Sequence, residues 1–133
     1  MGIKICIGVD FDGTLVKYTG WKGDDNIGEI VPLMAHRVHK WLKEGIEVRI
    51  VTARAYKYEM AVLMGESPEV CTEIFQKTIV PIIEWGKLNF HGYEFIVTSM
   101  KSPNMVEIWD DRAISVKSNV GTNLRLCKKT TLG

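Results

Sequence analysis

The feature that most constrains this chain is an apolar run at residues 3–9 that ends in the sequence VDFDGT at 9–14. A largely β-branched run of this kind predicts a strand of a parallel sheet that is covered on both faces. Asp10 and Asp12 follow at its carboxyl end, where Gly13 allows a sharp turn, and in an extended backbone they would point to the same side. Two carboxylates this close repel each other unless a cation lies between them, so the pattern favours Mg²⁺ binding or proton chemistry. The alternative is that Asp and Gly only terminate the strand.

The rest of the chain alternates predicted helices and strands. Apolar residues at helical spacing predict a helix over 32–44, and a long, mostly helical crossover follows at 56–91. The other predicted strands lie at residues 47–51, 93–98 and 105–109. Apolar residues between 114 and 127 predict short edge strands. We therefore expect an α/β fold, a three-layer Rossmann-like parallel sheet with helices on both faces, in a single domain over residues 1–133.

Polar side chains follow four of the predicted strands. They are Asp10 with Asp12, then Thr52, then Lys101 nearby, and finally Asp110 with Asp111. Because the carboxyl ends of parallel strands meet at one edge, where such sheets bind ligands, we expect these side chains to converge. Four carboxylates, a hydroxyl and an ammonium suit a divalent cation together with an anionic group. Arg54 would face the carboxylates; the alternatives are that Arg54 is a surface cation and that Thr52 caps a helix.

Charge and cysteine content exclude several functional classes. The formal net charge of the 133 residues is +1, which gives no basis for nonspecific binding to nucleic acid or to an anionic membrane. The opening apolar run reaches Asp10 too soon for a signal peptide or a transmembrane helix, so we expect no membrane attachment and a cytoplasmic location. Three scattered cysteines without CxxC spacing predict reduced thiols and neither zinc nor disulfides.

Two further patterns leave alternatives. Residues 8–14 imitate the glycine spacing of a phosphate-binding loop, but Thr14 stands where the lysine of that loop belongs. Residues 15–30 are rich in glycine and predict an exposed loop beside the carboxylates. Tyr18 and Trp21 in this loop either cover a ligand or pack the loop onto the body of the domain.

Taken in order, four stretches resemble the motifs of the haloacid dehalogenase-like (HAD) hydrolase superfamily, in its small capless phosphatase type. They are VDFDGTL at 9–15, IVTAR at 50–54, Lys101, and WDDRA at 109–113. The resemblance implies a HAD-like fold, and this chain has no room for a large cap domain. Lys87 is an alternative to Lys101.

By this resemblance the site residues have three roles. Asp10 is implied to be the nucleophile and Asp12 the general acid and base. Thr52 and Lys101 are implied to bind the phosphoryl group. Apart from the resemblance, Arg54, Lys57 and Tyr18 are candidate contacts if the substrate is a small nucleotide. The implied ligands of Mg²⁺ are Asp10, Asp12, Asp110 and Asp111.

The resemblance implies a Mg²⁺-dependent phosphomonoesterase that acts through an aspartyl phosphate. An open site would admit a small nucleotide, a polynucleotide end or a phosphoprotein, unless a second copy of the chain covers it. Two rival classes are a catalytically silent relative that binds a partner, and a receiver-type phosphoacceptor domain. A receiver domain needs an aspartate at the end of the middle strand, where this chain has Thr52.

Overall fold

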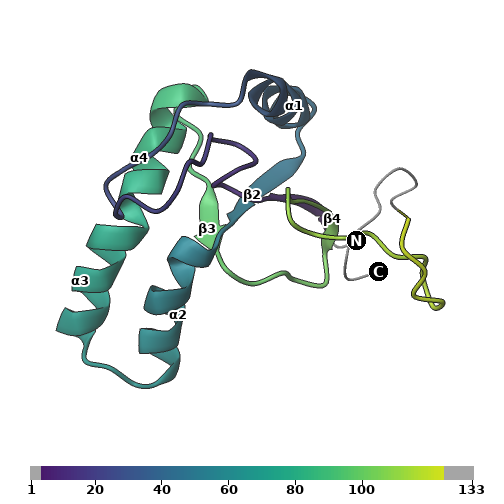
Figure 1. Ribbon diagram of the computed structural model, residues 1–133. Coiled ribbons are helices and arrows are strands. Elements are labelled where there is room, and N and C mark those ends of the chain that lie inside the picture. The colour runs from purple at the N-terminus through teal and green to yellow at the C-terminus, as the bar shows by residue number, and fades with distance from the viewer. Residues whose placement is uncertain (1–3, 125–133) are drawn as a thin grey trace.

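The computed structural model describes residues 4–124 and places them around a four-stranded parallel sheet (Figure 1). The strands are β1 (Cys6–Val9), β2 (Glu47–Val51), β3 (Ile96–Thr98) and β4 (Met105–Trp109). The helices are α1 (Pro32–Lys43), the 3₁₀ turn η1 (Ala53–Ala55), α2 (Tyr56–Leu63), α3 (Pro68–Thr78) and α4 (Val80–Asn89). The order in the sheet is β3-β2-β1-β4, and every neighbouring pair is parallel. The prediction of an α/β fold with a parallel sheet is confirmed.

Local sequence signals set the ends of the helices. α1 begins at Pro32, whose missing N–H costs nothing in a first turn, and it stops before Gly45, which has a φ of +80°. Ser67 caps α3, because its Oγ accepts a hydrogen bond at 3.2 Å from the backbone N–H three residues on. The third strand starts only at Ile96, later than the predicted start at residue 93, and Phe95 just before it is buried in the core.

One face of the sheet carries the core. Val9 of β1 lies beside Ile50 of β2, and both are fully buried. Val38 of α1 and Ile82 of α4 pack into the same cluster. Since β1, β2 and β3 follow one another in one direction across the sheet, right-handed connections place both helices on the same side.

The opposite face has no comparable helical layer in residues 4–124, so the prediction of helices on both faces is wrong for this part of the chain. A helix on this face would have to come from the connection between β3 and β4. That connection consists only of residues 99–104, which is too short for a crossover helix. Ser102 in this segment accepts a hydrogen bond from Arg49 Nη1 at 3.2 Å. Ile96 and Ile108 on this face remain 51% and 44% exposed.

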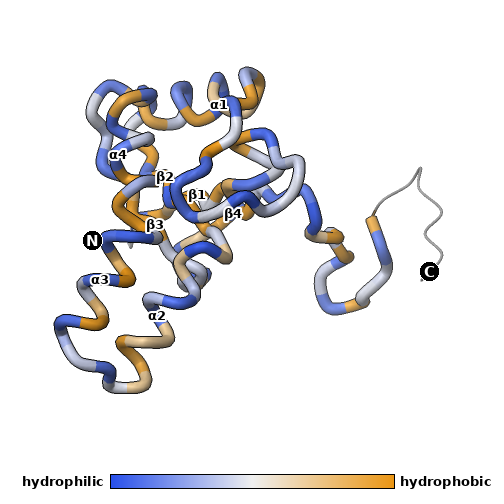
Figure 2. Tube along the Cα trace, turned by 60° about the vertical axis from the view of Figure 1, so that its left-hand side comes forward, coloured by the Kyte–Doolittle hydropathy of each residue, from blue (hydrophilic) through white to orange (hydrophobic). Residues whose placement is uncertain are grey.

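α2 and α3 form a helical hairpin that projects beyond the sheet in both overall views (Figures 1 and 2). Tyr58 and Phe75 join the two helices, with ring centroids 5.0 Å apart. The predicted helical crossover is therefore confirmed, and its first two helices lie beyond the carboxyl edge of the sheet.

The chain leaves the sheet after β4 (Figure 2). In residues 110–124 a single antiparallel bridge joins Val116 to Asn123, so the predicted edge strands do not form there, and Leu126 and Cys127 lie outside the described residues. Cys6 and Cys71 are free thiols, as predicted. No helix within residues 4–124 has the length and apolar character needed to cross a membrane.

Candidate active site at the carboxyl edge of the sheet

A tight turn at the end of β1 presents Asp10 at the edge of the sheet. Asp10 N donates to Trp109 O at 2.8 Å, which continues the pairing of β1 with β4. Phe11 O then accepts from Thr14 N at 3.1 Å, and Gly13 has a φ of +90°. Because this conformation is strained for other residues, glycine is what allows the chain to reverse immediately after Asp10.

Three carboxylates from two strand ends meet beside this turn. One oxygen from each of Asp10, Asp110 and Asp111 lies within 4.8 Å of the other two. Thr14 joins the group, since its Oγ1 lies 3.2 Å from Asp10 Oδ2 and 3.3 Å from Asp111 Oδ1, and accepts from Asp111 N at 3.1 Å. Burial raises the pKa of Asp10 to about 7, and the hydrogen bond with Asp111 and repulsion from Asp110 act in the same direction.

This group of donors fits a divalent cation. A bound cation would offset the repulsion from Asp110, which adds to the effect of burial in raising the pKa of Asp10. Asp110 and Asp111 are exposed, which leaves space for water ligands, and the Arg112 N–H orients Asp110 by donating to its Oδ1 at 2.7 Å. Oxygen ligands of this kind suit Mg²⁺, Ca²⁺ and Mn²⁺.

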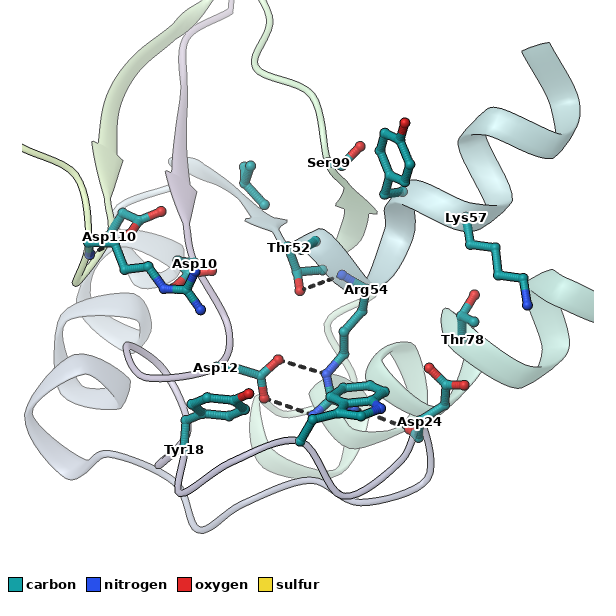
Figure 3. A pocket seen from close by; sticks show the side chains of 15 residues that line it. Asp10, Asp12, Tyr18, Asp24, Thr52, Arg54, Lys57, Thr78, Ser99 and Asp110 are labelled. Carbon is teal, nitrogen blue, oxygen red and sulfur yellow. Dashed lines mark hydrogen bonds and ion pairs between the residues drawn. The ribbon is translucent and has the colours of Figure 1, made fainter. Parts of the chain in front are cut away.

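Asp12 does not belong to this cluster, contrary to the prediction that it is a metal ligand. Its two oxygens accept hydrogen bonds from Arg54, with Nε at 2.7 Å from Oδ2 and Nη2 at 2.8 Å from Oδ1 (Figure 3). The prediction assumed an extended backbone, but the chain turns after Asp10 and aims Asp12 toward Arg54 instead. A proton on Asp12 would displace one of these hydrogen bonds.

Arg54 is buried and is not a surface cation. Its side chain is 5% exposed, and beyond Asp12 it donates to the carbonyl oxygens of Asp24 at 3.2 Å and Asn26 at 2.9 Å. Its guanidinium lies 4.8 Å from the centre of the Trp21 ring, a cation–π contact. These four hydrogen bonds use most of the five N–H groups of the guanidinium, so Arg54 chiefly positions Asp12 and the neighbouring loop.

Thr52 has a structural role and also faces the site. It is 3% exposed, and its Oγ1 accepts from Arg54 N at 3.2 Å, so the alternative of a helix cap is confirmed. Thr52 N donates to Thr98 O at 2.8 Å, which holds it at the end of β2. The hydroxyl retains its own hydrogen, which it can donate to a ligand.

A cavity of about 630 Å³ opens in front of Asp10, Asp12, Thr52, Arg54 and Asp110. Its remaining polar and aromatic wall comes from Tyr18, Trp21 and Asp24 of the loop, from Tyr56, Lys57 and Thr78 of the helices, and from Ser99 and Arg112.

Lys101 does not line the cavity and is exposed. The 99–104 segment that carries it crosses toward β4 over the opposite face, so nearness to the end of β3 in sequence does not bring it to the site. The lysine at the cavity is Lys57. Lys87, the other candidate, pairs with Glu94 at 3.0 Å and does not line the cavity either.

Several residues at the site were not among the candidates from sequence, and Thr14, Glu59 and Ser99 are three of them. Thr14 follows the DFDG sequence directly, so its position was available as a signal. Glu59 of α2 accepts from Ser99 N at 2.7 Å and from the hydroxyls of Thr98 and Ser99. Ser99 lines the cavity, but no spacing in the sequence relates it to Glu59, because the contact depends on how α2 packs against the end of β3.

Comparison of this chain with protein-family models, with curated proteins and with solved structures found no match. Membership of the HAD superfamily therefore stays a proposal.

Proposed function

We propose that this chain is a Mg²⁺-dependent phosphomonoesterase of the HAD type, with Asp10 as its nucleophile. One observation carries the proposal: Asp10 ends an interior strand, lies within 4.8 Å of Asp110 and Asp111, and forms part of the cavity wall. A carboxylate that faces a cavity beside further carboxylates suited to a cation is the arrangement needed for attack on a phosphate ester.

Asp10, Asp110 and Asp111 would hold the Mg²⁺ ion. When bound, the ion offsets the negative charge of the phosphate and of the carboxylates around it. The side chains of the cavity wall do not supply an excess of positive charge by themselves. The acidic residues of the cavity wall are Asp10, Asp12, Asp24 and Asp110, and its basic residues are Arg54, Lys57 and Arg112.

The reaction divides into two steps at Asp10. In the first, an oxygen of Asp10 bonds to phosphorus while the bond from phosphorus to the ester oxygen breaks, and the leaving oxygen takes a proton from Asp12 in its acid form, which leaves Asp12 as a carboxylate. In the second, water attacks the phosphoryl group, Asp12 accepts a proton from that water, and phosphate and free Asp10 are released. Thr52 would donate its hydroxyl hydrogen to a phosphoryl oxygen.

With both hydrogen bonds from Arg54 in place, the carboxylate of Asp12 can act in the second step without rearrangement. A carboxylate that is already ionised can take the proton of water directly. To protonate the leaving oxygen in the first step, Asp12 must first release one of its two hydrogen bonds from Arg54. Aryl phosphates, whose leaving oxygen needs little protonation, are therefore the best first substrates.

The decisive experiment is Mg²⁺-dependent phosphate release from p-nitrophenyl phosphate. We expect hydrolysis by the unchanged protein and a loss of several orders of magnitude in Asp10→Asn. Asp25→Asn is the matched control, because Asp25 is an exposed carboxylate that does not line the cavity, and it should keep the full rate.

Metal binding needs its own measurement, independent of turnover. Thermal unfolding with and without Mg²⁺ should show stabilisation of the unchanged protein, and Asp110→Asn combined with Asp111→Asn should abolish it. Equal phosphatase rates for the unchanged protein and Asp10→Asn would reject the enzymatic proposal and leave a binding protein as the better interpretation.

A further inference from the structure

The cavity extends well beyond the space that a phosphate group needs. At about 630 Å³ it has the size of pockets that hold small organic molecules. Figure 3 shows Asp10 and Asp110 on one side of it, and Lys57, Thr78 and Asp24 on the other. If the phosphoryl group lies at Asp10, as the proposed function requires, the rest of the substrate extends toward this second group of side chains.

Aromatic side chains also line this cavity. Trp21 is 56% exposed, Tyr56 is 58% exposed and Tyr18 is 43% exposed, although all three line a cavity. They come from two separate elements, the loop after β1 and the helix α2. Large exposed rings gathered on one concave surface mark a place for an apolar or planar ligand.

Trp21 is held in place before any ligand binds. The guanidinium of Arg54 lies 4.8 Å from the centre of its ring, and Arg54 is itself fixed by Asp12 and by two carbonyl oxygens of the same loop. A ring fixed in this way loses little freedom on binding. More than half of the Trp21 surface remains accessible, which leaves area for a second planar group to stack.

The charged side chains of the cavity wall favour a substrate with one phosphate group whose remaining part is uncharged. Beyond the carboxylates, the cations of the cavity are Lys57, Arg112 and the already paired Arg54. A polynucleotide would need a basic track for its other phosphates, which a chain of net charge +1 with this wall does not offer. Lys57, Thr78 and Asp24 instead provide a donor, a hydroxyl and an acceptor, which suit the hydroxyls of a sugar and the edge of a base.

We propose that the substrate is a nucleoside monophosphate, with its base stacked on the Trp21 side of the cavity and its phosphate at Asp10. The assignment of the phosphate end rests on the proposed function. The nucleoside end rests on the aromatic wall and can be tested without catalysis.

Binding to the Asp10→Asn protein in Mg²⁺ tests the nucleoside end, because this variant should not turn the ligand over. Isothermal titration calorimetry should give a Kd for adenosine 5′-monophosphate roughly tenfold or more below that for ribose 5-phosphate, which lacks the base. Adding Trp21→Ala should bring the two Kd values together, whereas Trp21→Phe, which keeps a ring, should retain most of the difference. Leu33→Ala is the matched control, since Leu33 has a similar exposure of 60% and does not line the cavity.

The outcomes separate this proposal from the phosphatase proposal. Equal Kd values for the two ligands in a folded protein overturn the nucleoside assignment, even if p-nitrophenyl phosphate is hydrolysed. A preference for the nucleotide that Trp21→Ala leaves unchanged overturns the stacking on Trp21. A preference that depends on Trp21, in a protein without phosphatase activity, supports the nucleotide site and rejects the enzyme.

Discussion

Single residues at the end of β1 determine what the candidate site can bind. The ideal Cβ position of Gly13 lies only 2.6 Å from Asp111 Oδ2, so the absence of a side chain there lets Asp111 approach Asp10. Thr14 then joins both carboxylates through one hydroxyl. The DFDGT sequence therefore does more than supply two aspartates, because its glycine and threonine let Asp111, which follows β4, lie beside Asp10.

Replacing Gly13 with alanine should weaken metal binding. The φ of +90° disfavours alanine, and the new methyl group would push Asp111 away from the cluster. We expect a loss of about 1–2 kcal/mol in the free energy of unfolding, measured with urea, and a higher Kd for Mg²⁺.

Gly45→Ala separates the two effects. Gly45 has a similar φ of +80° but nothing within 4 Å of its ideal Cβ position, so this variant should lose stability and keep its Mg²⁺ affinity. An unchanged Kd in Gly13→Ala would show that Asp111 is not a metal ligand.

At the scale of elements, the connections decide which side chains reach the cavity. The loop between β1 and α1 passes close to its own start, where Lys17 N donates to Glu29 O at 2.7 Å. Arg54, just after β2, holds this loop through Asp24 and Asn26. The β3–β4 connection is so short that it removes Lys101 from the site and leaves one face of the sheet without a helix.

Arg54→Leu should destabilise the protein strongly. It would leave the largely buried carboxylate of Asp12, 19% exposed, without its partner and would detach the loop, so we expect a loss of about 3 kcal/mol in the free energy of unfolding. Lys17→Met is the comparison, because the Lys17–Glu29 pair at 3.4 Å is exposed and should contribute less than about 1 kcal/mol. Similar losses in the two variants would mean that Arg54 does not tie the loop to the strand end.

At the scale of the whole molecule, the packing of α1 against the end of α4 links stability to pH. His39 of α1 stacks on Phe90, with ring centroids 4.4 Å apart, and lies 5.6 Å from His91. Burial lowers the pKa of His39, and His91 and His36 lower it further. Below the ordinary histidine pKa of about 6.5, the unfolded chain therefore binds this proton more readily than the folded one.

Above that pH, His39 should not lower the free energy of unfolding. Below it, the cost of protonating His39 in the folded protein should grow. Between about pH 7.5 and about pH 5.5, the free energy of unfolding of the unchanged protein should fall relative to that of His39→Gln. Asp10 titrates in both proteins, so the difference between their urea unfolding curves isolates His39. If the free energies of unfolding of the two proteins differ by the same amount at every pH in this range, protonating His39 does not destabilise the folded protein.

The sequence alone determined the order of strands and helices and the meeting of Asp10 with Asp110 and Asp111. Both follow from short-range rules, since periodicity identifies the elements and parallel strands bring their carboxyl ends to one edge. Only the tertiary structure decided that Asp12 pairs with Arg54, that Lys101 does not line the cavity, and that α1 and α4 lie on the same face of the sheet. Those outcomes depend on the direction that the chain takes after each strand, which is set by turns and packing between distant segments and not by the spacing of residues.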